Sequence, residues 1–149
     1  MKLRFLGTGT SFGVPVIGCS CGVCTSPDPR NRRTRHGLLL EEGRRRLLVD
    51  TPPELRLQLV AAGVDSLDGV FLTHPHADHL HGIDDLRAFS GRGADPIPLW
   101  IAAEHEAEVR GRFPYFLGPD PTIQPGTVVP GLDPIPFRDR ERIDAAGFD

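Results

Sequence analysis

The chain has 149 residues, of which 39% are hydrophobic and 25% charged, and this composition is typical of a single soluble globular domain over residues 1–149. A formal net charge of −3 disfavours a protein that binds nucleic acid through a broadly basic surface. No apolar run approaches the ~20 residues that cross a membrane, and the opening MKLRFLGTGTSFG has too short an apolar core for a signal peptide. These features predict a cytoplasmic protein.

In chain order, strand-like segments alternate with helix-like segments. Strands are predicted where apolar residues alternate or run together, at 2–7, 36–42, 44–50, 68–73 and 96–102. Helices are predicted at 51–63, 84–90 and 103–113. Thr51 is the expected cap of the first helix, and Gly63 its expected end. Strands that alternate with helices indicate a layered α/β fold.

The remaining segments are predicted to be irregular because glycine and proline are frequent in them. A long loop is expected between residues 7 and 34, and a second one crosses the surface between 114 and 136. Residues 139–149 are expected to contain one arm of a final hairpin.

One short stretch, THPHADHLHG at 73–82, holds four of the six histidines and follows directly on a predicted strand. His74 and His76 are two residues apart, so in an extended segment both rings point to the same side, and Pro75 favours that extension. Asp78 and His79 come next, at the expected start of a helical turn. Four side chains of types that commonly bind metals therefore follow the end of one predicted strand.

Neutral imidazole and carboxylate are good ligands for Zn²⁺ and also suit Mn²⁺ or Fe²⁺. We predict two adjacent ions, with His74 and His76 on one and Asp78 and His79 on the other. One alternative is a polar loop whose histidines cluster by chance. Another is a purely structural metal, although closed sites usually prefer four compact ligands and thiolates. His81 is either a substrate contact or general acid, or an exposed helix residue.

The three cysteines form a second candidate site within the loop GVPVIGCSCGVC (13–24). At this spacing, Cys19, Cys21 and Cys24 can hold one structural Zn²⁺ if a fourth ligand comes from elsewhere. The alternatives are three unrelated reduced thiols or a redox pair, and the redox pair lacks a thioredoxin-like context.

The H-x-H-x-D-H run, together with FLGTGTSFG (5–13) and LLVDTPPE (47–54), resembles the opening half of the metallo-β-lactamase superfamily. This resemblance implies an αβ/βα sandwich with a binuclear metal site, in which Asp50 supports the stretch at 73–82, the histidine loop, from behind the ligands. The alternative for Asp50 is a helix cap. Two such ions share a bridging hydroxide that attacks a phosphorus or carbonyl centre, with Asp78 as ligand and as the catalytic group that orients the hydroxide.

Combined with the cysteine loop and RNRRTR (30–35), the pattern resembles the phosphoribosyl cyclic phosphodiesterase branch of that superfamily. The resemblance implies hydrolysis of a small cyclic phosphodiester, and a distant histidine as the fourth ligand of the cysteine zinc. The pyrroloquinoline quinone biosynthesis B branch has a similar cysteine loop but a degraded histidine run. The ribonuclease Z branch shares the histidine run but lacks the cysteine loop, and no long basic arm for gripping tRNA is visible here.

The resemblance covers about residues 3–113, and no histidine follows residue 113. In the superfamily, further histidines and a bridging aspartate come from a second half, so this chain is expected to represent only the first half of the sandwich. We consider three explanations: a truncated gene, a fragment boundary, or a homodimer that completes the site from two chains. An inactive metal-binding module is the corresponding alternative to an enzyme.

Overall fold

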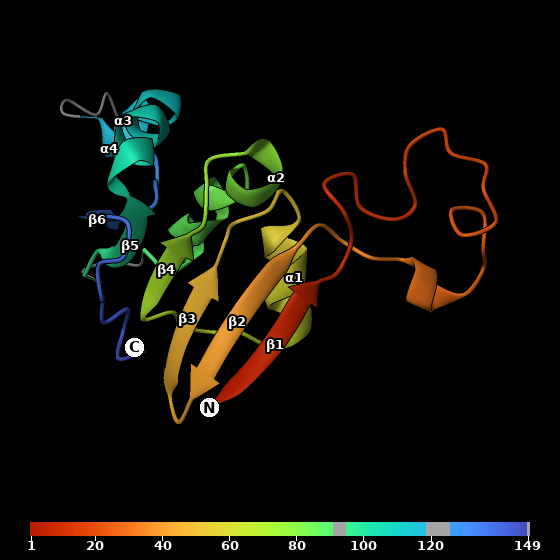
Figure 1. Ribbon diagram of the computed structural model, residues 1–149, viewed down its shortest axis with the longest axis horizontal. Coiled ribbons are helices and arrows are strands. Elements are labelled where there is room, and N and C mark those ends of the chain that lie inside the picture. Colours follow the sequence, from red (N-terminus) through yellow and green to blue (C-terminus); the bar gives the residue numbers. More distant parts are fainter. Residues whose placement is uncertain (91–94, 119–125, 149) are drawn as a thin grey trace.

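A computed structural model describes residues 1–90, 95–118 and 126–148 of the chain. In these residues one sheet of six strands runs in chain order (Figure 1): β1 Lys2–Gly7, β2 Gly37–Glu42, β3 Arg45–Val49, β4 Gly69–Leu72, β5 Ile97–Ala102 and β6 Leu132–Phe137. The first three strands are antiparallel, and β3 to β6 are parallel to one another. The carboxyl ends of β3, β4 and β5 therefore lie at the same edge of the sheet.

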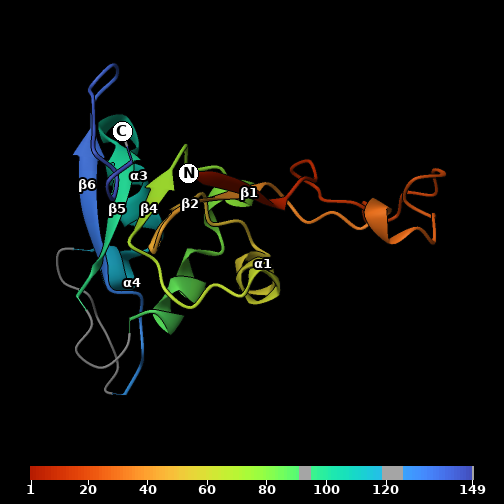
Figure 2. The same cartoon turned by 90° about the horizontal axis from the view of Figure 1, so that it is seen from below.

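Short helices cover one face of this sheet: α1 Leu55–Ala62, α2 Ala77–Leu80, η2 Ile83–Ala88, α3 Ala103–Arg112 and α4 Pro114–Leu117. Figure 2 shows α1 packed to one side of the strands. The main core lies between the two layers and is almost entirely aliphatic, with Leu48, Val70 and Leu99 from the strands and Leu55 and Ile83 from the helices. Burial of this aliphatic surface is the main force that fixes the helices on the sheet.

The opposite face of the sheet is also apolar but is only partly covered. Leu47 and Trp100 are buried there beneath the segment that carries Ala145, in the smaller of the two cores. Farther along the same face, Leu3 is 49% exposed and Phe5 is 63% exposed on β1. The described chain is thus a helical layer and a sheet with a second apolar face that is open towards β1.

Most predicted strands are confirmed to within a residue or two, but several other segments differ from expectation. The helix predicted at 51–63 begins only at Leu55, and Gly63 ends it in a left-handed conformation with φ 67°. The segment predicted at 84–90 is a 3-10 helix, η2. The loop predicted at 114–136 was wrong in part, since it contains α4 and most of β6, and its residues 119–125 lie outside the described residues.

The strand β6 was missed because it reads LDPIPF, with two prolines. Proline removes a ladder hydrogen bond and is tolerated in strands at a sheet edge, and β6 pairs only with β5 in the described sheet. The hairpin arm predicted at 139–149 is present only as a bridge between Ala145 and Phe148, and residue 149 lies outside the described part.

Residues 8–36 project from the sheet as an extended arm (Figure 1). Gly9 N–H donates to the Thr34 carbonyl at 2.7 Å, and Val14 pairs with Arg33, so the two legs of the arm are joined near its base. A short 3-10 turn, η1 Pro29–Asn31, lies farther out. Among the described residues, no helix is long and apolar enough to cross a membrane.

Candidate metal centre

The predicted ligands gather at the edge of the sheet where β3 and β4 end. Asp50 follows the last residue of β3, and Thr73 and His74 follow the last residue of β4. Because these strands are adjacent and parallel, their carboxyl ends lie side by side. The histidine loop and Asp50 are therefore brought together by the topology, although 23 residues separate Asp50 from Thr73.

Asp50 is the polar centre of this edge and is fully buried. Its Oδ1 accepts hydrogen bonds from the backbone N–H and the hydroxyl of Thr73, both at 2.8 Å. Its Oδ2 lies 2.7 Å from Nδ1 of His79. Asp50 adopts φ 64°, a left-handed conformation that aspartate tolerates better than most residues. One buried carboxylate thus binds both ends of the histidine loop. These hydrogen bonds provide the partners that a buried polar group needs.

The next residue, Thr51, also binds the histidine loop, and it does not cap α1 as predicted. Its backbone N–H donates to the His79 carbonyl at 2.7 Å, and its hydroxyl donates to the Leu80 carbonyl at 3.1 Å. Gly82 N–H returns a bond to the Thr51 carbonyl at 2.8 Å. A Cβ at Gly82 would lie 2.0 Å from the Pro52 carbonyl oxygen, so the close approach of these two turns requires glycine.

These contacts fix which ring nitrogens are available to a metal. The Thr73 hydroxyl has one proton, which it donates to Asp50, so its oxygen accepts the Nδ1 proton of His74 at 2.9 Å. His79 donates its Nδ1 proton to Asp50. In the neutral form of both rings, Nε2 is therefore the atom with the free lone pair. Burial, together with the charges of neighbouring His79 and His76, lowers the pKa of His74, which favours the neutral ligand form.

The four predicted ligands form two pairs. Within each pair, the two donor atoms are about as far apart as two ligands of the same metal ion. His74 Nε2 lies 3.1 Å from His76 Nδ1, and His79 Nε2 lies 3.4 Å from Asp78 Oδ2. Two donors bound to one tetrahedral Zn²⁺ at ordinary bond lengths are about 3.4 Å apart. The His74 and His79 ring centroids are only 4.1 Å apart, so the two pairs are adjacent.

The structure adds one residue to this cluster, His36, for which the sequence pattern predicted no role. Its Nδ1 lies 3.5 Å from Asp50 Oδ2, and its ring centroid is 5.4 Å from that of His79. That Nδ1 is buried and makes no hydrogen bond within the described ranges. His36, Asp50 and His79 are close enough to hold an ion. However, Asp50 and the Nδ1 of His79 already bind each other, so we assign this group to supporting the loop.

The cysteines form a separate group on the projecting arm, away from the histidine loop in Figure 1. The Sγ atoms of Cys19, Cys21 and Cys24 lie within 4.8 Å of one another. The backbone N–H of Cys24 and the thiol of Cys19 lower the pKa of Cys21 to about 7. No fourth His, Cys, Asp or Glu joins this group in the described part of the chain, so the predicted distant ligand is not seen there.

Two other histidines lie outside these clusters. His81 follows α2, is exposed, and lines a cavity beside the loop with His76 and Arg112. His105 lies in the first turns of α3, 3.6 Å from Glu104, away from the described ligands.

Comparison with known proteins identifies the class to which this sheet and ligand cluster belong. A sequence model of the beta-lactamase superfamily domain matches residues 45–145. The chain therefore belongs to this superfamily, as the histidine run predicted, and its sheet with one helical layer corresponds to one part of the expected sandwich.

Particular relatives share different parts of the chain. An octanoyltransferase of Porphyromonas gingivalis is 42% identical over 130 residues, which are 85% of this chain and 25% of that protein. A ribonuclease Z of a Bradyrhizobium strain is 43% identical over 77 residues, covering 50% of this chain and 24% of that protein. The chain thus spans about a quarter of the length of these curated relatives.

Solved structures agree with the fold. A diphosphatase of the PhnP family is 40% identical with a TM-score of 0.72, over 76% of this chain and 46% of that one. Zinc-bound PqqB from Methylobacterium extorquens has a TM-score of 0.68 over 91% of this chain and 46% of that one. At 22% identity, the second likeness concerns the fold alone.

Proposed function

We propose that this chain carries the metal-binding half of a hydrolase that cleaves a small phosphodiester, cyclic substrates included. The observation that carries the proposal is the pair of donor separations, 3.1 Å and 3.4 Å, each matched to one ion. His74 and His76 would hold one ion, and Asp78 and His79 the other. Nitrogen and oxygen donors of this kind fit Zn²⁺, and also Mn²⁺ or Fe²⁺.

When bound, two such ions lower the pKa of water towards neutrality and offset negative charge on a phosphoryl group. The chain's own residues prepare for this chemistry. Asp50 fixes the Nδ1 proton of His79 directly and that of His74 through Thr73, so the two Nε2 lone pairs face the ligand cluster. Asp78, whose side chain is 23% exposed, keeps an oxygen for orienting the attacking water.

Two comparisons support a phosphorus centre over other substrates. The PhnP-family structure, at 40% identity, is a diphosphatase, and the ribonuclease Z relative cleaves RNA according to its name. Both names describe hydrolysis of a bond to phosphorus. We favour a small substrate because the formal net charge is −3, which offers no broad electrostatic attraction for RNA.

We also propose that Cys19, Cys21 and Cys24 hold a structural Zn²⁺ on the arm. Three thiols within 4.8 Å suit a thiolate site that lacks one ligand. Its role would be to stiffen the arm, since this cluster lies apart from the histidine loop (Figure 1).

The proposal is tested by hydrolysis of bis(p-nitrophenyl) phosphate with purified protein. Turnover should disappear with a chelator and return with Zn²⁺ or Mn²⁺, and His76→Ala should reduce it by at least about a hundredfold. His105→Ala is the matched control, a histidine on α3 outside the cluster, and should leave turnover unchanged. Turnover that resists both the chelator and His76→Ala would contradict the proposal.

The main alternative is a metal-binding module without turnover. It is favoured by the donor count, because each proposed ion has only two protein donors within the cluster, and a catalytic ion usually has three. Further ligands would then have to come from a second copy or from another polypeptide. Metal binding without hydrolysis of any phosphodiester would support this alternative, and cleavage of precursor tRNA would instead support a ribonuclease Z-like enzyme.

A further inference from the structure

The two ligand pairs are held to the rest of the molecule in different ways. The pair of Asp78 and His79 is bound directly by the residue that follows β3, because Asp50 contacts the His79 ring. His76 is exposed, and among the described residues its ring has a hydrogen-bonding neighbour only in His74, the other member of its pair. The position of His76 therefore depends on what holds its backbone.

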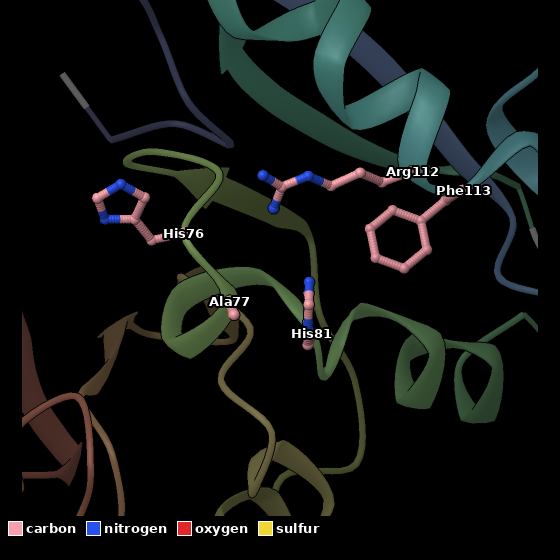
Figure 3. Close-up of a pocket in the computed structure, with 5 residues that line it drawn as sticks. All are labelled: His76, Ala77, His81, Arg112 and Phe113. Carbon is pink, nitrogen blue, oxygen red and sulfur yellow. The ribbon is translucent and has the colours of Figure 1, made fainter.

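The backbone beside His76 is held by Arg112, the last residue of α3. Its Nη1 donates a hydrogen bond to the carbonyl oxygen of Pro75, a buried residue that lies between His74 and His76 and 37 residues before Arg112. Figure 3 shows the Arg112 side chain reaching from α3 towards the loop, and the His76 ring pointing away to the other side. Arg112 thus binds the backbone that carries the ring and leaves the ring free to bind a metal.

A second hydrogen bond fixes the direction of the Arg112 guanidinium. Its Nη2 donates to Glu108, four residues earlier on α3. A planar guanidinium that is bound through two nitrogens has little freedom to turn. Glu108 also offsets the positive charge, which alone would repel a metal ion at the nearby pair. The Pro75 carbonyl is therefore held at a defined position relative to α3.

The position of this carbonyl affects the first ligand pair through the geometry of the chain. The proline ring fixes φ of Pro75 near about −65°, so a movement of its carbonyl turns the peptide group that leads into His76. His74 Nε2 and His76 Nδ1 are 3.1 Å apart, and bond lengths in a metal site vary by only about 0.2 Å. A small displacement of the carbonyl is thus enough to weaken one ligand while the loop stays folded.

We propose that Arg112 is a positioning residue for the ion held by His74 and His76, and that it does not act on the ion held by Asp78 and His79. The inference rests on the proposed function, because both pairs must bind metal ions. It makes the affinity of one ion depend on α3, whereas the other ion depends on the support that follows β3.

The test is a titration of metal-free protein with Mn²⁺, in which electron paramagnetic resonance measures the unbound ion. Mn²⁺ suits imidazole and carboxylate donors, and the thiols of the arm prefer softer ions. Asp78→Ala protein reports on the first pair, and His76→Ala protein reports on the second. Adding Arg112→Met should weaken Mn²⁺ binding about tenfold in the first background and leave it unchanged in the second.

Two further variants separate positioning from a general effect on α3. Arg112→Lys keeps an N–H donor on a long side chain, so it should recover most of the affinity of the first pair. Arg110→Met is the matched control and should leave both affinities unchanged. Arg110 has the same two kinds of partner, Glu106 four residues earlier and a carbonyl at 2.7 Å, but the carbonyl is that of Leu117 on α4.

An unchanged affinity of the first pair in Arg112→Met would overturn the inference. An equal loss at both pairs would also overturn it, because Arg112 would then act on the stability of the whole loop. Tighter binding would do the same, since the charge of Arg112 would then outweigh its hydrogen bond. Failure of the proposed function is read from the wild type alone: if neither pair binds Mn²⁺ or Zn²⁺, the proposed function fails and this inference fails with it.

Discussion

Nδ1 of His79 lies 2.7 Å from Oδ2 of Asp50, a fully buried carboxylate 29 residues earlier in the chain. The same carboxylate accepts two hydrogen bonds from Thr73, at the other end of the loop. A charged group is buried at such a cost only where its partners satisfy it, and here the groups that donate hydrogen bonds to the Asp50 side chain belong to the histidine loop. The position of the candidate ligands therefore depends on Asp50.

Asp50→Asn should weaken metal binding about 10- to 100-fold, because the amide cannot accept all the bonds that orient His79 and Thr73. Asparagine tolerates the left-handed backbone at this position, so the change tests the carboxylate. Metal affinity is measured by competition with a chelating dye. Asp65→Asn, which affects an exposed acid that pairs with Arg46, should leave the affinity unchanged. Equal affinities in both variants would contradict the assignment.

Gly82→Ala should destabilise the protein by about 1–3 kcal/mol, since the new methyl group would overlap the Pro52 carbonyl. The turn after the histidines would have to move away from Thr51. Gly111→Ala is the control because a Cβ there meets nothing within 4 Å on α3, and it should stabilise by up to about 1 kcal/mol. Urea denaturation of both variants measures the difference, and a neutral Gly82→Ala would show that the turns are not in tight contact.

Cys21→Ser should remove one zinc per chain and leave the ions at the histidine loop in place, since the two clusters lie on different parts of the molecule. Ser20→Ala, between two of the cysteines, should change nothing. Zinc is measured by plasma mass spectrometry together with the rate of thiol alkylation. In metal-free protein, Cys21 should be alkylated near neutral pH because its pKa is lowered to about 7. A zinc content unaffected by Cys21→Ser would rule out the arm site.

Tyr115 donates a hydrogen bond to Asp84 at 2.7 Å, and burial together with this carboxylate raises the pKa of Tyr115 from 10.0 to about 12. The folded state therefore binds the phenolic proton more tightly than the unfolded state does. The resulting stability is fully present below pH 10 and is lost as the pH rises towards about 12.

The chain has a single tyrosine, so the ultraviolet absorbance of tyrosinate reports the titration of Tyr115 alone. Asp84→Asn should lower the midpoint towards the ordinary value of 10.0, whereas Asp85→Asn should leave it near 12. A midpoint near 10.0 in the wild type would mean that α4 is not held against η2 by this bond.

The sequence predicted best those features of the site that depend on residues close together in the chain. The x-H-x-H spacing of His74 and His76 predicted two rings on one side, and their nitrogens lie 3.1 Å apart. The support from Asp50 followed from the superfamily resemblance, and its hydrogen bond to His79 agrees with it.

Contacts between distant segments could not be predicted in this way. Thr51 has the features of a helix cap, but its partners are carbonyls 28 and 29 residues away. His36 comes to the site because β2 is antiparallel to β3 and so begins at the edge where β3 ends. The feature of the sequence that could have indicated this role is that His36 directly precedes a strand of the predicted hairpin. The strand β6 was hidden by Pro134 and Pro136, which are tolerated because β6 lies at the edge of the sheet formed by the described residues.

The central claim is that His74, His76, Asp78 and His79 hold metal ions. Its most direct test is the metal content per chain after dialysis without chelator, for wild type, His76→Ala/Asp78→Ala and His105→Ala. We predict that the wild type and His105→Ala retain the same content and that the double variant loses two ions. A double variant with the metal content of the wild type would contradict the account.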